Sequence, residues 1–492
     1  MRNLFRPPTE ALTSDLSLAM RAVVAATPLA RSHERELPYA VRDLSRLLTQ
    51  DRSQLSQSYW VGKRLLYAYC RYFLPWNLLR LSWLLPNLDI PMPEDGTILD
   101  IGSGPLTFPI ALWLAKPEWR YRPLTVICTD VSPAPLAAGR DIFKHLAPDS
   151  PWVIETVRAP LEKAIAGLRR EAHCITAGNV LNELKPSRET PLEERLAALA
   201  RRIAGKLAEN GRFLAMEPGT RLGGKLMALT RLAAFSAHLV PDSPCPHWGP
   251  CPMLAPRASG WCHFSHTTTA APGELTALTA RAKLGKEHLN LACMLLRKAT
   301  EEEQKTAASH MDGLSGPDTD DWDDADFDDD LFGDDLPGGE NSLDASGIQE
   351  WAEAYALVRN SAEQSFVRIL SDPIRLPDES EAARYGCSSR GLVLAKNAYR
   401  MPSGAAVAIR WPEKAERDAK SGALLLELPK QEPQNYTPGI KKEYPRSGEK
   451  TAPKRPAPKG LGTKRERSGP KPERAESRPP RPSMRGKSKG RS

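Results

Sequence analysis

The fold is predicted from one stretch of the sequence, Ile98-Leu99-Asp100-Ile101-Gly102-Ser103-Gly104-Pro105. Its first half is a short apolar run, which is typical of a buried strand. Its second half holds two glycines, which let a ligand approach the backbone closely at a strand-to-helix turn. Proline is favoured in the first turn of a helix, so we expect a helix from about Leu106 to Ala115.

Strands and helices continue to alternate along the chain. Further strands are predicted at 124–130, 152–157, 173–177 and 211–217, and further helices at 134–146 and 192–207. This alternation predicts a parallel sheet with helices on both faces. A last apolar run, 289–296, is expected to close the sheet.

Composition divides the chain into five predicted parts. They are an N-terminal helical region (1–93), the strand–helix domain (94–300) with a cysteine-rich loop (244–266), an acidic insertion (301–346), a small C-terminal β-rich subdomain (347–429) and a basic tail (430–492). The insertion and the tail are too poor in apolar residues to bury a core, so both are expected to be disordered.

Charge is distributed very unevenly. The formal net charge is +8, but residues 312–344 carry −14 and residues 451–492 carry +11. A basic body with a basic tail favours a polyanionic partner, most often nucleic acid. The alternative is a tail that only keeps the protein in solution. The tail lacks interleaved aromatic residues, so we expect contact with phosphates rather than stacking on bases.

No export or membrane segment is predicted. The N-terminus lacks the apolar core of a signal peptide, and the longest apolar stretch, 67–88, is interrupted by arginines and prolines. We therefore expect a cytoplasmic protein with no membrane partner.

A second carboxylate extends the first motif. Asp130 ends the next predicted strand, 30 residues after Asp100, where it can accept both hydroxyls of a ribose. The pair resembles the class I S-adenosylmethionine-dependent methyltransferase fold, a Rossmann-like α/β fold. A dinucleotide site would have a third glycine where Thr107 stands. The alternative is an ordinary strand–turn–helix unit in which Asp130 has no role in binding. The predicted cofactor-binding residues are Asp100, Gly102, Ser103, Gly104, Asp130 and Asn179.

No catalytic residue is visible. Asn179 begins the loop after the fourth predicted strand, Asn179-Val180-Leu181-Asn182-Glu183. Amino-group methyltransferases carry an Asn/Asp-Pro-Pro-aromatic tetrad in that loop, and this loop does not match it. An equally good interpretation is that Asn182 and Glu183 cap the next helix. Cys174 lies inside a predicted strand and is more consistent with a core residue than with a nucleophile.

Four cysteines form the other candidate site: Cys245, Cys251, Cys262 and Cys387. Clustered cysteines in a chain without an export signal are more often metal ligands than disulfides. Paired Cys-x-x-Cys knuckles of a zinc ribbon are missing, and irregular cysteine-only spacing favours an iron–sulfur cluster. His247, His263 and His266 lie nearby in the sequence and are potential zinc ligands, so zinc is the alternative metal. The third interpretation is that the four thiols bind no metal.

Together these motifs resemble a known family. The order Leu-Asp-Ile-Gly-Ser-Gly-Pro, Asn-Val-Leu-Asn-Glu-Leu, Cys-Pro-His…Gly-Pro-Cys-Pro and Trp-Cys-His-Phe-Ser is similar to the methyltransferase-like family of the mitochondrial small ribosomal subunit and its bacterial relatives. The similarity covers roughly residues 35–300 and extends weakly to 366–400. The acidic insertion and the basic tail depart from the family pattern.

The resemblance implies small-subunit ribosomal RNA and the small ribosomal subunit as partners. It also implies S-adenosylmethionine as cofactor and a 4Fe–4S cluster, with zinc as the alternative, ligated by Cys245, Cys251, Cys262 and Cys387. The expected function is RNA methylation by an S-adenosylmethionine-dependent enzyme. The alternative is a non-catalytic assembly factor that docks on ribosomal RNA through the same fold. A small-molecule methyltransferase is disfavoured by the basic tail.

Overall fold

The computed structural model of the protein describes residues 3–49, 62–184, 190–255, 260–314, 345–358, 366–375, 382–398 and 401–428. All of these residues belong to the first of the two units into which the chain divides, Met1–Glu432 and Pro433–Ser492. The predicted basic tail lies outside the described residues, and so does the acidic insertion between 315 and 344.

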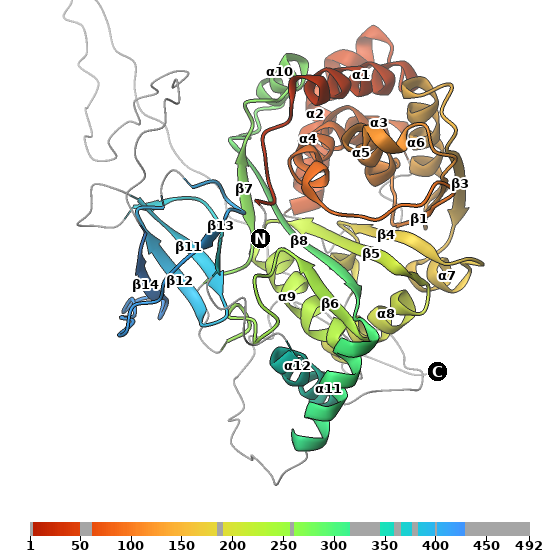
Figure 1. Cartoon of the computed structure of the whole chain (residues 1–492). Coiled ribbons are helices and arrows are strands. Elements are labelled where there is room, and N and C mark those ends of the chain that lie inside the picture. The colour runs from red at the N-terminus through yellow and green to blue at the C-terminus, as the bar shows by residue number, and fades with distance from the viewer. Residues whose placement is uncertain are drawn as a thin grey trace, which may run out of the picture. The chain divides into compact units, whose positions relative to one another are not determined.

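The larger sheet has eight strands (Figure 1). They are β1 (Thr97–Ile101), β2 (Thr125–Asp130), β3 (Val153–Arg158), β4 (Ala172–Gly178), β5 (Leu207–Pro218), β6 (Leu239–Ser243), β7 (Phe264–Thr267) and β8 (His288–Lys298). Their order is β3-β2-β1-β4-β5-β8-β6, and β7 pairs with β8. Strands β1 to β5 are parallel, whereas β8 runs antiparallel to both β5 and β6. This order, with one reversed strand near the edge, confirms the predicted class I methyltransferase fold.

One expectation about the sheet is wrong. The run 289–296 was expected to close it, but β8 lies between β5 and β6, and β6 occupies the edge. The sequence of β6 is Leu239-Val240-Pro241-Asp242-Ser243, which is short, contains a proline and ends in polar residues. Proline is tolerated in a sheet mainly at an edge, so the location fits the sequence even though the pattern did not predict a strand.

Strand β1 is buried along its whole length because helices cover both faces of the sheet. Ile98 pairs with Val126 and Cys174 and faces one core, whereas Leu99 and Ile101 face the other. The first face packs α1 (Glu10–Ala26), α4 (Leu74–Leu84), α5 (Thr107–Ala115) and α6 (Pro133–Leu146). The second packs α7 (Leu161–Ala166), α8 (Leu192–Ala204) and α9 (Arg221–Phe235).

The described residues of the N-terminal part, 3–49 and 62–93, are mostly helical. It contains α1, α2 (Arg31–Thr49), α3 (Lys63–Ala68), a π-helical turn η2 (Tyr69–Phe73) and α4. Thr9 caps α1 by accepting a hydrogen bond from the Leu12 backbone at 3.3 Å. A short helix, α10 (Gly273–Arg281), precedes β8.

Two helices lie where the acidic insertion was expected to begin and end. Helix α11 spans Glu301–Leu314 and α12 spans Ala345–Val358. Tyr355 of α12 stacks on Phe235 of α9, with ring centroids 5.5 Å apart, so α12 packs against the larger domain. Helix α11 therefore takes up residues 301–314, which composition alone assigned to a disordered segment.

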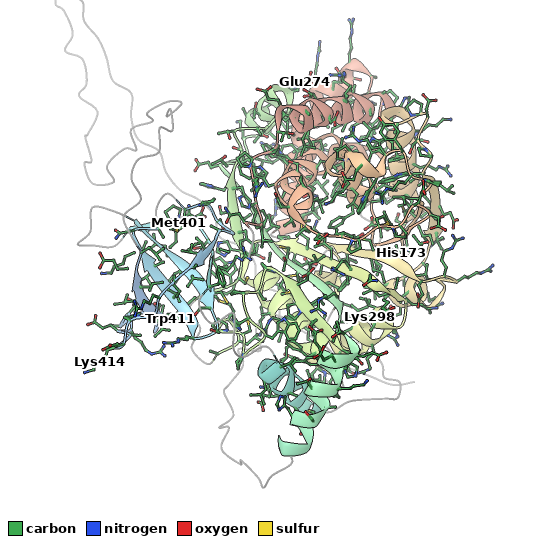
Figure 2. All side chains as sticks on the ribbon, viewed as in Figure 1. His173, Glu274, Lys298, Met401, Trp411 and Lys414 are labelled. Carbon is green, nitrogen blue, oxygen red and sulfur yellow. The ribbon has the colours of Figure 1, made fainter. Side chains whose placement is uncertain are left out.

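The C-terminal strands form a separate six-stranded sheet. They are β9 (Phe366–Ile369), β10 (Ile374–Arg375), β11 (Ala382–Ser388), β12 (Gly391–Lys396), β13 (Ala406–Ala408) and β14 (Leu424–Glu427). Met401 belongs to the core of this sheet, and the Arg390 guanidinium lies 4.9 Å from the centre of the Trp411 ring. Figure 2 labels Met401 and Trp411 in this part of the molecule.

Candidate functional site

The glycine turn follows β1 at the carboxyl edge of the sheet. Gly102 and Gly104 have φ values of +65° and +52°, a region that favours glycine. A Cβ atom on Gly102 would lie 2.7 Å from the Val180 side chain, whereas one on Gly104 would have nothing within 4 Å. Ser103 fixes the turn by donating from its backbone to the Thr129 carbonyl at 2.8 Å. The turn therefore leaves open space at Gly104.

Asp100 lies at the centre of this edge and is only 1% exposed. Its Oδ1 accepts a hydrogen bond from Thr176 Oγ1 at 2.6 Å, and its Oδ2 has no partner in the part of the chain that the structure describes. Burial raises the pKa of Asp100 to about 7, and hydrogen bonds from Thr176 and Ser103 oppose that rise. A buried carboxylate oxygen without a partner indicates a position where a ligand or water donates.

Asp130 ends β2 and connects it to the same turn. Its Oδ2 accepts from the Gly104 backbone at 3.0 Å, and its Oδ1 accepts from the Ser132 backbone at 2.8 Å. Burial raises the pKa of this carboxyl group, and the backbone donors oppose the rise. Each carboxylate oxygen has more than one acceptor position, so Asp130 retains capacity for two hydroxyl donors of a ribose.

Asn179 follows β4 with a φ of +57°. Its backbone donates to the Met216 carbonyl at 2.8 Å, and its buried Oδ1 has no partner within the described ranges. Asp100, Asp130 and Asn179 thus stand at or near the ends of β1, β2 and β4. The strand order reverses at β1, and ligands of open α/β sheets bind outside the carboxyl ends at such a reversal. These residues fit a bound adenosine-type ligand, and their role in binding stays a prediction.

Glu217 is a residue of this edge that the sequence did not reveal. It lies on β5, is fully buried, and its Oε1 accepts from the backbones of Leu181 and Asn182 at 2.9 and 3.3 Å. Its Oε2 accepts from Asn182 Nδ2. The loop after β4 is therefore fixed by Glu217, and the capping interpretation is wrong because α8 begins only at Leu192 after Pro191. The only available signal was an acidic residue near the end of an apolar strand.

The four cysteines come from two parts of the chain. Cys245, Cys251 and Cys262 follow β6, and Cys387 lies on β11 of the C-terminal sheet. Burial raises the pKa of the Cys245, Cys262 and Cys387 thiols, and the charges of neighbouring cysteines raise each of them further. His247 Nε2 lies 3.4 Å from Cys387 Sγ. The structure therefore brings the four predicted residues into one neighbourhood.

Two buried arginines lie beside these thiols. Arg231 and Arg368 are 2% and 3% exposed. Arg231 donates to the carbonyls of His247 and Gly249 at 3.2 and 2.6 Å, and Arg368 donates to the carbonyl of Pro244 at 2.9 Å. Burial lowers the pKa of Arg368 to about 10, and the charges of nearby cysteines oppose that fall. No motif in the sequence predicts that either arginine joins this cluster.

A ligand set for a metal is not formed by these positions. Across the described ranges, no group of three or more histidine, cysteine, aspartate or glutamate side chains is arranged to hold a metal ion. Arg231 nonetheless places a buried positive charge beside Cys245, where the negative charge of a thiolate ligand would be favourable. Ligation by Cys245, Cys251, Cys262 and Cys387 stays a prediction.

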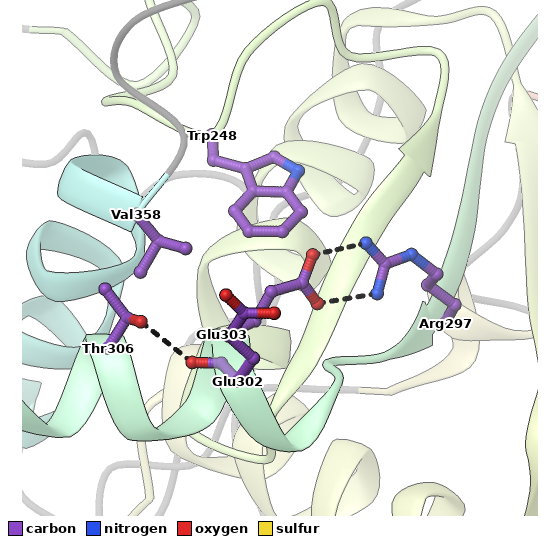
Figure 3. Close-up of a pocket in the computed structure, with 6 residues that line it drawn as sticks. All are labelled: Trp248, Arg297, Glu302, Glu303, Thr306 and Val358. Carbon is purple, nitrogen blue, oxygen red and sulfur yellow. Dashed lines mark hydrogen bonds and ion pairs between the residues drawn. The ribbon is translucent and has the colours of Figure 1, made fainter.

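A pocket of about 390 Å³ lies next to the cysteine-rich loop (Figure 3), and none of the predicted cofactor-binding residues lines it. It is lined by Trp248, Arg297, Glu302, Glu303, Thr306 and Val358. Arg297 and Glu303 form a two-point ion pair at 2.8 and 2.7 Å. Thr306 donates to the Glu302 backbone carbonyl at 2.8 Å, within α11. These contacts hold α11 against β8 and account for the pocket's polar walls.

Three comparisons place the chain among known proteins. Residues 68–308 match the family model described as mitochondrial small ribosomal subunit Rsm22. No curated protein matches the chain. Among solved structures, the precorrin-6Y C5,15-methyltransferase of Geobacter metallireducens GS-15 is 13% identical, with a TM-score of 0.27 over 45% of this chain and 87% of that one. The mitomycin 7-O-methyltransferase MmcR is 14% identical, with a TM-score of 0.30 over 59% and 76%. No described helix has the length and apolarity needed to cross a membrane.

Proposed function

We propose that this chain, which belongs over residues 68–308 to the Rsm22 family, binds S-adenosylmethionine and acts on the small ribosomal subunit. The donor would lie at the carboxyl edge of β1, β2 and β4. The observation that carries this proposal is the pair of buried oxygens without partners, Asp100 Oδ2 and Asn179 Oδ1, beside the open backbone of Gly104.

The residues have separate roles in this proposal. Asp130 would accept the ribose hydroxyls, and the Gly102–Gly104 turn would lie against the amino-acid end of the donor. Asp100 and Asn179 would accept from the donor's polar hydrogens. Binding is tested by calorimetry with S-adenosylmethionine and S-adenosylhomocysteine on the full chain. A complete lack of heat and of competition with either ligand would exclude a donor site.

The partner assignment rests on the family and on charge. The matched family is described by its place in the mitochondrial small ribosomal subunit, and the basic segment 451–492 carries +11. Basic segments bind phosphates with an affinity that falls steeply with salt. Co-sedimentation of the protein with isolated small subunits, measured across a salt series, tests the association. Binding to large subunits with equal affinity would contradict it.

A non-catalytic assembly role is the second candidate. Glu217 accepts from Leu181 and from Asn182, so it fixes the loop after β4 where an amino-group methyltransferase would place its acceptor tetrad. The two candidates differ in product. Mass-spectrometric mapping of small-subunit RNA in a deletion strain would find a missing methyl group for an enzyme and an unchanged methylation pattern for a scaffold.

We further propose an iron–sulfur cluster on Cys245, Cys251, Cys262 and Cys387, with zinc as the alternative metal. Support comes from the mutual electrostatic influence of the thiols and from Arg231, whose positive charge lies beside Cys245 and would favour a thiolate there. Thiols must deprotonate to bind metal, and neighbouring cations favour that step. Anaerobic purification followed by iron, sulfide and zinc analysis decides between the two metals, and protein free of all three would reject both.

A further inference from the structure

A positive cluster of one buried and one half-buried cation lies between the N-terminal helices and the loop before β8. Arg80, on α4, is 8% exposed, and its Nη1 donates to Asn77 Oδ1 at 2.7 Å. Its Nε is buried and has no hydrogen-bond partner among the described residues. Lys286, in the loop before β8, lies over the Trp76 ring at 5.8 Å. Within the described part of the chain, no ion pair involves Arg80 or Lys286.

The two cations are close enough to affect each other. Burial lowers the pKa of Lys286 to about 8, and the charge of Arg80 contributes to that fall. Burial also lowers the pKa of Arg80 to about 10. Two neighbouring cations without a counter-charge are costly inside a protein. Such a cluster is consistent with a site that a ligand completes, because unsatisfied buried groups usually have an ion, a water or a function to explain them.

The cluster is connected to the proposed donor site through Tyr69. Asn77 Nδ2 lies 3.5 Å from the Tyr69 hydroxyl. The charge of Arg80 lowers the pKa of Tyr69, and the charge of Asp130 raises it. Tyr69 begins the π-helical turn η2, and π-helical turns are frequent at functional sites. Tyr69 is therefore close enough to both Arg80 and Asp130 for their charges to shift its pKa.

We propose that Arg80 and Lys286 bind the carboxylate of the methyl donor, while Asp130 binds its ribose. S-adenosylmethionine carries both groups in one small molecule. Arg80 is too deeply buried for the backbone phosphate of a folded RNA to reach without opening of the N-terminal helices. The carboxylate would accept from the free Nε of Arg80 and from the Lys286 ammonium, and it would supply the missing negative charge. This inference rests on the proposed donor binding and adds the group that recognises the amino-acid end.

The test compares S-adenosylmethionine with decarboxylated S-adenosylmethionine, which lacks only the carboxylate. By calorimetry, the wild type should bind the intact donor about ten- to a hundredfold more tightly, the range expected for a hydrogen bond to a charged group. Arg80→Gln and Lys286→Gln should lose this preference and keep the affinity for the decarboxylated ligand. Arg64→Gln is the control, because Arg64 pairs with Asp43 on the surface and its side chain is 51% exposed.

Each outcome separates the two proposals. A wild type that binds both ligands equally overturns the carboxylate site and leaves donor binding standing. A wild type that binds neither overturns both. Variants that lose RNA affinity without any change toward either ligand assign the cluster to a phosphate instead.

Stability gives a second readout. Removing an uncompensated buried cation should leave the melting temperature of the ligand-free Arg80→Gln protein equal to or above that of the wild type. A purely structural Arg80 would lower it, and Arg80→Lys, which keeps the charge, should retain part of the preference for the intact donor.

Discussion

Asp100 gives the most direct test of the donor site, because the structure predicts that its ionisation opposes folding. The residue is 1% exposed, and burial raises its pKa from the ordinary 3.8 to about 7. Between these two values the native state holds the proton more firmly than the unfolded chain does. The stability of the ligand-free protein should therefore fall as the pH rises from about 4 to about 7, and then stay level.

The magnitude follows from the size of the shift. A difference of about three pH units corresponds to roughly 4 kcal/mol at about 1.4 kcal/mol per unit, which is an upper bound on the cost. Asp100→Asn removes the charge but keeps an oxygen that accepts from Thr176 Oγ1. The ligand-free variant should therefore be more stable than the wild type at pH 8 by up to that amount. The two proteins should converge in stability toward pH 4.

The assay is urea unfolding of ligand-free wild type and variant at several pH values between 4.5 and 8. Asp43→Asn is the control: its side chain is 52% exposed, and losing its surface ion pair with Arg64 should cost less than about 1 kcal/mol at any pH. Affinity for S-adenosylmethionine should fall in Asp100→Asn even though stability rises, as at other strained functional sites. The reasoning is refuted if the stability difference between wild type and Asp100→Asn does not change with pH, or if the variant is the less stable protein at pH 8.

Three further predictions concern the other sites. Asp130→Ala should weaken S-adenosylmethionine binding, measured by calorimetry, by about 1.5–3 kcal/mol for each lost hydrogen bond to the carboxylate; unchanged affinity would remove Asp130 from the site. Deleting 451–492 should reduce the slope of log affinity for small-subunit RNA against log salt in filter binding, because fewer counterions are released; an identical slope would exclude phosphate contact by the tail. Cys387→Ser should abolish bound metal and speed hydrogen exchange in 382–398 without altering S-adenosylmethionine binding; full metal content in the variant would remove Cys387 from the ligand set.

Much of the fold could be predicted because local pattern and tertiary structure agree in the larger domain. Strand β1 is buried along its length, and β2 and β4 are buried or half-buried throughout, so their sequences are largely apolar. Strand β6 was missed because an edge strand needs no such run, and Pro241 reads as a break. The position of β8 between β5 and β6 depends on pairing over long sequence distances, which periodicity does not encode.

Some residues of the candidate sites could be predicted from the sequence and others could not, for a related reason. Asp100, Asp130 and Asn179 are recognisable because each follows or ends a strand, so a motif marks its place. Glu217 and Arg80 are not marked in this way. Each lies in an apolar element, and its importance comes from what the fold places beside it: the loop after β4 for Glu217 and Lys286 for Arg80.

The same charge argument applies at both candidate sites and connects them to ligand binding. Arg80 and Lys286 are partly or fully buried without an ion pair among the described residues, and Arg231 is buried beside a thiol whose pKa is raised. Burying these cations costs folding free energy, and negative ligands would return it on binding. Donor and metal should therefore each stabilise the protein against unfolding, and their effects should add, because the two sites share no residue. A donor that raises the melting temperature only in metal-loaded protein would contradict this independence and indicate that the cysteine cluster controls the donor site.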